Sequence, residues 1–237
     1  MPAKIKQISA ESMKISPIAY ITTQFPEKFG IPRQSGLANS IYGRIVFVPE
    51  YRNPDALRGL EDFSHLWLIW GFSANSEREH WQPMVRPPRL GGNERMGVFA
   101  TRSPFRPNPL GLSCVEIDRI ERDSSDGPVI YVKGADLMDG TPIYDIKPYV
   151  KYADSRPHAS CGYVDSLKEN TLKVIIPEDV AGGVCDKSLL EPLTEILRLD
   201  PRPSYHDDPE RVYGLSFSGK EVHFKVSSGI LTVVNIE

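Results

Sequence analysis

Three closely spaced prolines, Pro104, Pro107 and Pro109, constrain the fold of this chain more than any other local feature. Each proline fixes φ and removes a backbone donor, and each disfavours helical geometry at the residue before it. Residues 97–100 are predicted to form a strand that ends before this run. Residues 101–109 are therefore predicted to form a stiff, irregular loop.

The loop carries two guanidinium groups and one amide, which belong to Arg102, Arg106 and Asn108. A pre-ordered loop loses little entropy when it binds a ligand, and a guanidinium can grip a carboxylate or phosphate through two parallel hydrogen bonds. A surface turn with solvated arginines is the alternative interpretation. Because prolines lock these side chains in place, the pattern favours an anion-binding site.

Short segments rich in β-branched and aromatic residues fill the first part of the chain, and Pro or Gly separates them. One short helix is expected over residues 54–61, with Asn53 as its cap and Pro54 at its first position. Strands do not alternate with full-length helices, so the pattern favours a barrel or sandwich over a doubly wound sheet. The predicted strands cover residues 15–22, 40–51, 65–72, 97–100, 111–120, 129–132 and 143–152.

The pattern changes after about residue 155, where leucines and isoleucines at helical spacing predict a helix over residues 186–197. We predict a β-rich, barrel-like domain over residues 1–157 and a small α+β domain over residues 158–237. The strands expected in the second domain cover residues 172–176, 215–217, 222–226 and 231–236, and the middle two form a hairpin.

Composition indicates an ordinary soluble globular protein, with 40% hydrophobic and 25% charged residues in 237. No apolar run reaches membrane-spanning length, and the first residues lack the apolar centre of a signal peptide. Cys114, Cys161 and Cys185 are isolated, which is typical of reduced thiols in a cytoplasmic protein.

The formal net charge of -3 does not indicate a nucleic-acid partner, but the local charge does. Residues 81–110 contain five arginines and a single acidic residue, Glu94. Chance clustering on a solvated loop is one interpretation. A basic patch that faces an RNA backbone is the other.

Motifs of several common enzyme classes are absent from the sequence. It contains no G-x-x-x-x-G-K-[ST] phosphate loop, no G-x-G-x-x-G after a strand and no G-x-S-x-G nucleophile elbow. No two histidines have metal-ligand spacing, so no metal site is predicted.

Acidic residues gather around a predicted turn at residues 139–142. Asp139 is explained simply as a turn residue that caps nearby amides. Asp136 closes the preceding strand, and a carboxylate at a strand end suits a ribose diol or a cation. Further along, Arg202 lies between two prolines, where it either packs the domains together or provides a second anion contact beside an aromatic ring.

Two of these runs, residues 97–111 and 136–149, resemble the signature stretches of the TsaA-like family. Members of this family are bacterial tRNA N(6)-adenosine methyltransferases that use S-adenosylmethionine. The resemblance covers nearly the whole chain and is weakest over residues 160–184. Further matching stretches are residues 29–36, 59–67, 86–92 and 200–205.

The resemblance implies a β-barrel methyltransferase domain unrelated to the Rossmann type, and a homodimer. It implies methylation of the exocyclic amine of a threonylcarbamoyl-modified adenosine just 3′ of the anticodon, in threonine tRNA. The partner is thus the anticodon loop of a tRNA, and no membrane is involved.

The family's cofactor site maps onto a defined set of positions in this sequence. Its early loop reads Pro-Arg-Gln-Pro-Gly, whereas Ser35 replaces the second proline here. The cofactor-binding residues implied are Arg33, Gln34, Gly36, Ser73, Ala74, Arg102, Leu112, Ala135, Asp136 and Leu137.

Physical reasoning adds roles for the remaining charged residues. Anticodon-loop phosphates would be held by Arg86, Arg89, Arg95, Arg106 and Arg202, although Arg106 could instead line the cofactor pocket. The catalytic group is unassigned, and Asp139 or a backbone carbonyl is a candidate to orient the amine. Two other functions remain open: a non-catalytic tRNA-binding module and a metal-dependent phosphoester hydrolase.

Overall fold

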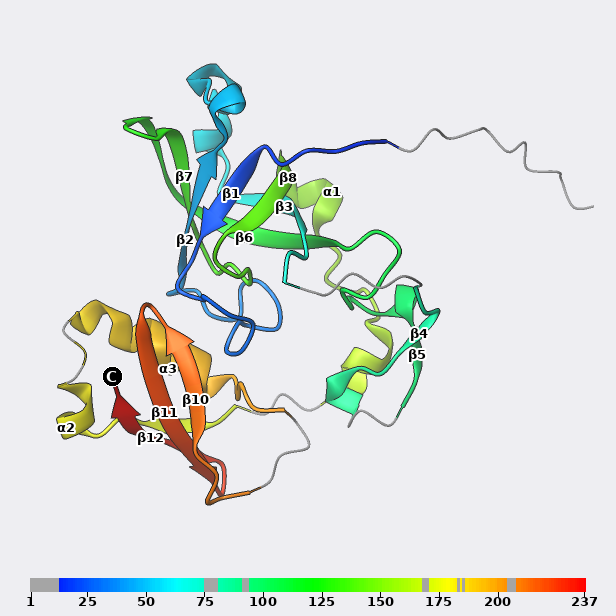
Figure 1. The fold of residues 1–237 in the computed structure, drawn as a ribbon. Coiled ribbons are helices and arrows are strands. Elements are labelled where there is room, and N and C mark those ends of the chain that lie inside the picture. The colour runs from blue at the N-terminus through cyan, green and yellow to red at the C-terminus, as the bar shows by residue number, and fades with distance from the viewer. Residues whose placement is uncertain are drawn as a thin grey trace, which may run out of the picture.

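The structure is a computed structural model that describes residues 13–74, 81–90, 94–167, 171–182, 184, 186–203 and 208–237. Six antiparallel strands close into a barrel in the order β1-β2-β7-β6-β3-β8 (Figure 1). The predicted barrel-like fold is confirmed. The strands are β1 (Ala19–Thr22), β2 (Tyr42–Phe47), β3 (His65–Gly71), β6 (Leu110–Ser124), β7 (Gly127–Lys133) and β8 (Thr141–Pro148).

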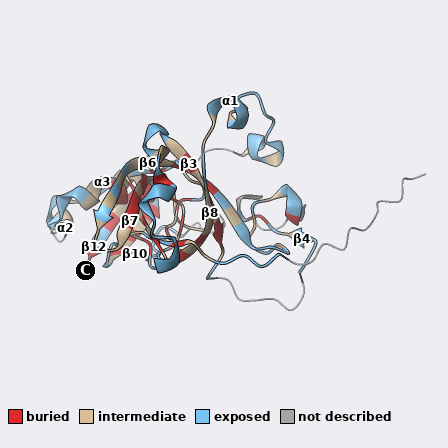
Figure 2. Ribbon diagram, turned by 90° about the horizontal axis from the view of Figure 1, so that it is seen from above, coloured by how far each residue is buried: buried red, intermediate tan, exposed pale blue. Residues whose placement is uncertain are grey.

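The barrel interior is apolar because alternate strand residues point inward. On β3, for example, Leu66 and Leu68 are fully buried while the alternate residues Trp67 and Ile69 are partly exposed. The same alternation buries Ile45 on β2. Figure 2 shows that buried residues concentrate on the strands and exposed ones on the outlying turns.

Three loops of the first domain lie at the same end of this barrel. In an antiparallel barrel, the ends of β1, β3 and β7 lie beside the starts of β2, β6 and β8. The segments between these ends cover residues 23–41, 72–109 and 134–140. The topology therefore brings the three stretches that carry the predicted site to one end of the barrel.

The longest of these segments makes a small arm, which Figure 1 shows away from the barrel. Its strands β4 (Met84–Val85) and β5 (Met96–Gly97) pair antiparallel. The strand predicted over residues 97–100 is wrong: Val98–Ala100 is a 3-10 turn. Thr101 stabilises this turn because its hydroxyl donates to the Val98 carbonyl at 2.9 Å.

Two other predicted elements change type for local reasons. The helix expected over residues 54–61 is two 3-10 turns, Pro54–Leu57 and Leu60–Asp62, because Gly59 between them has φ +83. The strand expected over residues 143–152 ends at Pro148 and is followed by the short helix α1 (Lys151–Asp154). The Asp154 carboxylate accepts from the amide of Val150, the residue before this helix, at 2.7 Å.

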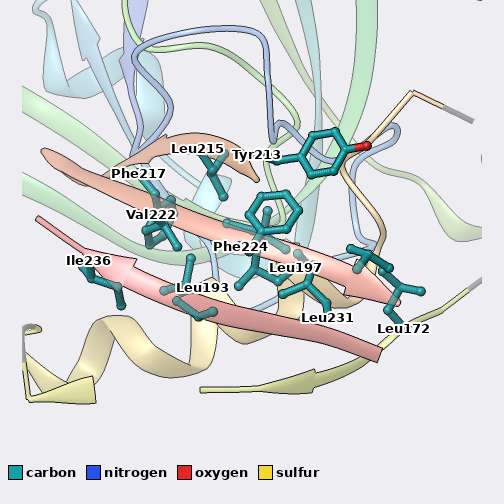
Figure 3. Packing of buried hydrophobic residues seen from close by; sticks show 14 of the residues in the cluster. Leu172, Leu193, Leu197, Tyr213, Leu215, Phe217, Val222, Phe224, Leu231 and Ile236 are labelled. Atoms are coloured by element: carbon teal, nitrogen blue, oxygen red, sulfur yellow. The ribbon is translucent and has the colours of Figure 1, made fainter. Parts of the chain in front are cut away.

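The second domain packs helices against a four-stranded sheet of order β10-β11-β12-β9. Figure 3 shows Leu193 and Leu197 of the main helix beneath apolar side chains of the sheet. Tyr213 and Phe224 stack with ring centroids 5.5 Å apart. The elements are β9 (Lys173–Ile175), α2 (Glu178–Ala181), α3 (Leu190–Arg198), β10 (Tyr213–Phe217), β11 (Lys220–Ser227) and β12 (Ile230–Ile236).

The loop between β1 and β2 belongs to the core of the second domain. Phe25, Ala38 and Ile41 are buried in the same cluster as β10, β11 and α3. Glu195 on α3 accepts hydrogen bonds from the amide and hydroxyl of Ser40, at 2.9 and 2.6 Å. The second domain therefore holds the loop that carries residues 33–36. The predicted boundary between residues 157 and 158 stays a prediction.

Candidate active site

A cavity of about 620 Å³ lies at the loop-bearing end of the barrel. Its walls combine cations, ring faces and one half-buried carboxylate, which is the composition of a small-molecule site. The 31–34 loop, the end of β3, the 101–112 stretch and the segment after β7 all contribute. The residues that border this cavity include Arg33, Gln34, Trp70, Ser73, Ala74, Arg102, Arg106, Leu112 and Asp136.

A hydrogen-bond relay supports the carboxylate of this cavity. The Trp70 indole Nε1 donates to the Ser113 hydroxyl at 2.9 Å, and that hydroxyl donates to Asp136 Oδ1 at 2.6 Å. Trp70 and Ser113 are 8% and 1% exposed, so the indole N–H and the hydroxyl form hydrogen bonds within the protein rather than with water. The relay fixes the Asp136 side chain against the cavity wall.

Burial raises the pKa of the Asp136 carboxyl above its ordinary value. Hydrogen bonds from Ser113, from its own amide and from the Ser35 amide act in the opposite direction, as does the positive charge of Arg102. The group is thus a desolvated acceptor beside a cation, and such groups concentrate at functional sites.

Arg102 bridges two loops at the cavity edge. Its Nη1 donates to the side-chain oxygen of Gln34, and Gln34 Nε2 donates to the Arg33 carbonyl at 2.5 Å. The Arg106 guanidinium turns back and donates to the Thr101 carbonyl at 3.2 Å. Residues 101–109 contain no strand and no helix, as the prolines predict.

The structure brings seven of the ten predicted cofactor residues together in this cavity. They are Arg33, Gln34, Ser73, Ala74, Arg102, Leu112 and Asp136. The side chains of Ala135 and Leu137 instead point into the barrel core, at 0% and 1% exposure. Gly36 supports the site through its backbone, because its amide donates to the Gly134 carbonyl at 2.9 Å.

The predicted RNA-binding arginines separate into three environments. Arg86 and Arg95 line a second cavity beside the first, and Arg106 lines the first. Arg202 is 12% exposed and forms a bidentate pair with Asp200 at 2.8 and 2.9 Å, which raises its pKa. The side chain of Arg89 and the segment 204–207 lie outside the described residues.

Asp139 lies apart from the cofactor cavity. Its Oδ1 accepts from the Thr23 amide at 2.9 Å, and the residue borders a different cavity together with Arg44 and Tyr131. This bond reaches an amide just after β1 rather than an amide of the Asp139 turn, so the explanation by local capping stays a prediction. Its role as an orienting group stays a prediction.

Sequence reasoning missed Trp70 and Ser113, which read as ordinary strand residues. Ser113 lies on β6 and Trp70 lies on β3. The residue of β3 directly opposite Ser113 is Leu68 and not Trp70, so strand pairing alone does not predict this contact. Asp136 reaches Ser113 from the segment after β7. The one local signal is Gly111, which stands directly opposite Trp70 and leaves room for the indole ring.

The described residues hold neither a metal-binding cluster nor a membrane-spanning helix. No three His, Cys, Asp or Glu side chains among them are placed to hold a metal ion. No helix in that part of the chain is long and apolar enough to span a bilayer.

Fold and cavity together define a closed-barrel protein with a small-molecule site at the barrel end, distinct from the Rossmann class.

Comparison with known proteins specifies the family. The tRNA-methyltransferase O N-terminal domain matches residues 20–155, and the TrmO C-terminal domain matches residues 170–237. An Escherichia coli protein named tRNA (adenine(37)-N6)-methyltransferase is 39% identical over 95% of this chain and 98% of its own. The chain therefore belongs to the tRNA-methyltransferase O family.

Two further relatives agree with this membership. A Pyrococcus abyssi protein, named as a probable S-adenosyl-L-methionine-binding protein, is 36% identical over 63% of this chain and 74% of its own. The crystal structure of TrmO from Pseudomonas aeruginosa superposes with a TM-score of 0.75 and 31% identity. That alignment covers 96% of this chain and 100% of the other.

Proposed function

We propose that this chain methylates the N6 amine of adenosine 37 in tRNA and takes the methyl group from S-adenosylmethionine. The main observation behind this proposal is that Arg102 and Asp136 line the same cavity. The relatives of this chain are named for the same reaction. Sequence signatures far apart in the chain thus converge on one small-molecule site.

The residues of the cavity fit the chemical groups of S-adenosylmethionine. Arg102 suits the carboxylate of the amino-acid part, and the half-buried Asp136 carboxylate suits the hydroxyls of a ribose diol. Trp70 and Leu112 offer apolar surface for the adenine. When bound, S-adenosylmethionine supplies a methyl group on a positively charged sulfur, so no metal and no covalent enzyme intermediate is needed.

The contribution of the protein is alignment and exclusion of water. Arg102 and Gln34 fix the mutual position of the two loops, and the Trp70–Ser113–Asp136 relay fixes the opposite wall. Holding two reactants in line replaces a bimolecular encounter and can supply most of a rate enhancement. A poorly hydrated cavity also favours transfer from a cationic donor to a neutral amine.

The resemblance to the TsaA-like family supports finer proposals. The target adenosine carries a threonylcarbamoyl group and lies just 3′ of the anticodon of threonine tRNA, and the enzyme acts as a homodimer in the cytoplasm. A base in an anticodon loop is already unpaired, so its displacement into a cavity costs little. Arg86 and Arg95 are the proposed phosphate contacts. Arg202 is not proposed as a phosphate contact, because its guanidinium already pairs with the Asp200 carboxylate.

The direct test is a methylation assay with the purified chain, S-adenosylmethionine and tRNA from a strain that lacks the gene. Mass spectrometry of the digested tRNA should show one added methyl group on the threonylcarbamoyl-modified nucleoside. A methyl group on unmodified adenosine would contradict the finer proposal only. Tight S-adenosylmethionine binding with no methylated nucleoside would leave the tRNA-binding module as the better function.

A further inference from the structure

A second cavity of about 870 Å³ adjoins the cofactor cavity. The β4–β5 arm forms one side of it, and the 101–105 stretch forms the side toward the barrel. Five residues border both cavities, so the two cavities are adjacent. These residues are Arg33, Gln34, Thr101, Arg102 and Pro104.

The lining of the second cavity differs from that of the first. Four arginines border it, and none of the described residues that border it is acidic. Arg86 and Arg95 are exposed, and no carboxylate of the described chain lies within ion-pair distance of either. Prolines, Met84, Val85 and two aromatic rings complete the surface. This combination of cations and ring faces suits a nucleotide, which has a phosphate and a flat base.

One of the two rings comes from a segment that neither family domain covers. Tyr163 lies between the matches at residues 20–155 and 170–237. It nevertheless borders the cavity beside residues 82–88. In Figure 1, the segment that carries Tyr163 runs next to β4 and β5, far from the second-domain sheet.

Local hydrogen bonds order the backbone that carries this ring. Tyr163 belongs to the 3-10 turn Gly162–Ser166. The Cys161 amide donates to Asp165 Oδ2 at 2.8 Å, and the Ser166 hydroxyl donates to the Tyr163 carbonyl at 2.8 Å. The backbone of the turn is therefore hydrogen-bonded on both sides of Tyr163.

We propose that the second cavity receives the target nucleotide of the tRNA and that Tyr163 stacks on its base. The inference rests on the proposed function and assigns a substrate-binding residue to it. Arg86 and Arg95 hold phosphates at the cavity rim, and Arg102 and Gln34 border both cavities, so the base lies next to the cofactor. Phe105, at 37% exposure, borders the same space.

The test compares Tyr163→Leu, which keeps apolar bulk without a π face, with Tyr163→Phe, which keeps the ring. Tyr152→Ala is the matched control, because Tyr152 is 88% exposed on α1 and borders neither cavity. Each variant of the full chain is assayed for kcat/KM with tRNA and for S-adenosylmethionine affinity by calorimetry. A second readout is the fluorescence of an anticodon stem–loop with 2-aminopurine at the target base, which stacking quenches.

Tyr163→Leu should lower kcat/KM for tRNA by about tenfold or more, the loss expected for one base–ring stack. It should also relieve the quenching of 2-aminopurine and leave S-adenosylmethionine affinity unchanged. Tyr163→Phe and Tyr152→Ala should behave like the wild type in all three measurements. A Tyr163→Leu protein with wild-type kcat/KM and wild-type quenching would overturn the inference. A wild-type protein that methylates no tRNA would instead overturn the proposed function.

Discussion

The Ser113 hydroxyl donates a hydrogen bond of 2.6 Å to Oδ1 of Asp136, and the Trp70 indole donates to that same hydroxyl at 2.9 Å. One small side chain on β6 therefore couples the aromatic wall of the cofactor cavity to its only carboxylate among the described lining residues. The site depends on this relay because neither Trp70 nor Ser113 can exchange its partner for bulk water.

Ser113→Ala removes the centre of the relay. Loss of the hydroxyl leaves the indole N–H and the carboxylate without a buried partner, so the free energy of unfolding should fall by about 1–3 kcal/mol. Urea unfolding measures this loss. In a double-mutant cycle with Asp136→Asn, the two losses should not add, because both variants break the same interaction. Strict additivity would contradict the relay.

Asp136 should make stability depend on pH in a defined direction. Because its pKa is raised in the folded state, its contribution is fully present below the unfolded pKa of about 3.9 and is lost as pH rises through the folded pKa. The unfolding free energy of wild type relative to Asp136→Asn should therefore fall as pH rises from about 4 toward neutrality. Urea unfolding of both proteins over that range checks the sign, and a difference that grows in favour of the wild type would contradict it.

Gly111→Ala should damage the site through Trp70. A Cβ at position 111 would lie 2.2 Å from Cε2 of the Trp70 ring, so the ring must move. We expect a destabilisation of about 1–3 kcal/mol together with weaker S-adenosylmethionine binding. Gly97→Ala is the matched control, since a Cβ at that position meets nothing within 4 Å. Equal calorimetric affinity for the two variants would show that Trp70 does not shape the cavity.

Arg86→Ala combined with Arg95→Ala should weaken tRNA binding and make it less sensitive to salt. Each phosphate contact on a single strand contributes about 0.7 to the slope of log K against log salt, so the double variant should lose about twice that. Gel-shift titration at several salt concentrations measures both quantities. Arg58→Ala is the control, because its side chain is 78% exposed and pairs with Asp55. An unchanged slope in the double variant would show that these arginines do not contact RNA phosphates.

The barrel could be predicted from the sequence because its strands are short, β-rich and separated by Pro and Gly. The loop over residues 101–109 was predictable for an equally local reason, since three prolines exclude regular structure. The helix predicted over residues 186–197 corresponds to the 3-10 turn Lys187–Leu189 and α3, where Asp186 supplies a cap by accepting from the Ser188 amide. These features depend on residues close together in the chain.

Features that depend on distant contacts were not predictable. Phe25 reads as a loop residue, but it is fully buried against Phe217 in the second domain. Tyr163 carries no periodic signal, and only the folded chain places it beside the β4–β5 arm. Long-range packing overrides local pattern in each case.

The central claim is that the cavity around Arg102 and Asp136 binds S-adenosylmethionine. Titration calorimetry of wild type and Arg102→Ala with this ligand tests it most directly, because Arg102 is exposed and its removal should leave the fold intact. The account predicts that the wild type binds one ligand per chain and that Arg102→Ala, with an unchanged unfolding transition, shows no measurable binding. An Arg102→Ala protein that binds S-adenosylmethionine with wild-type affinity would contradict the account.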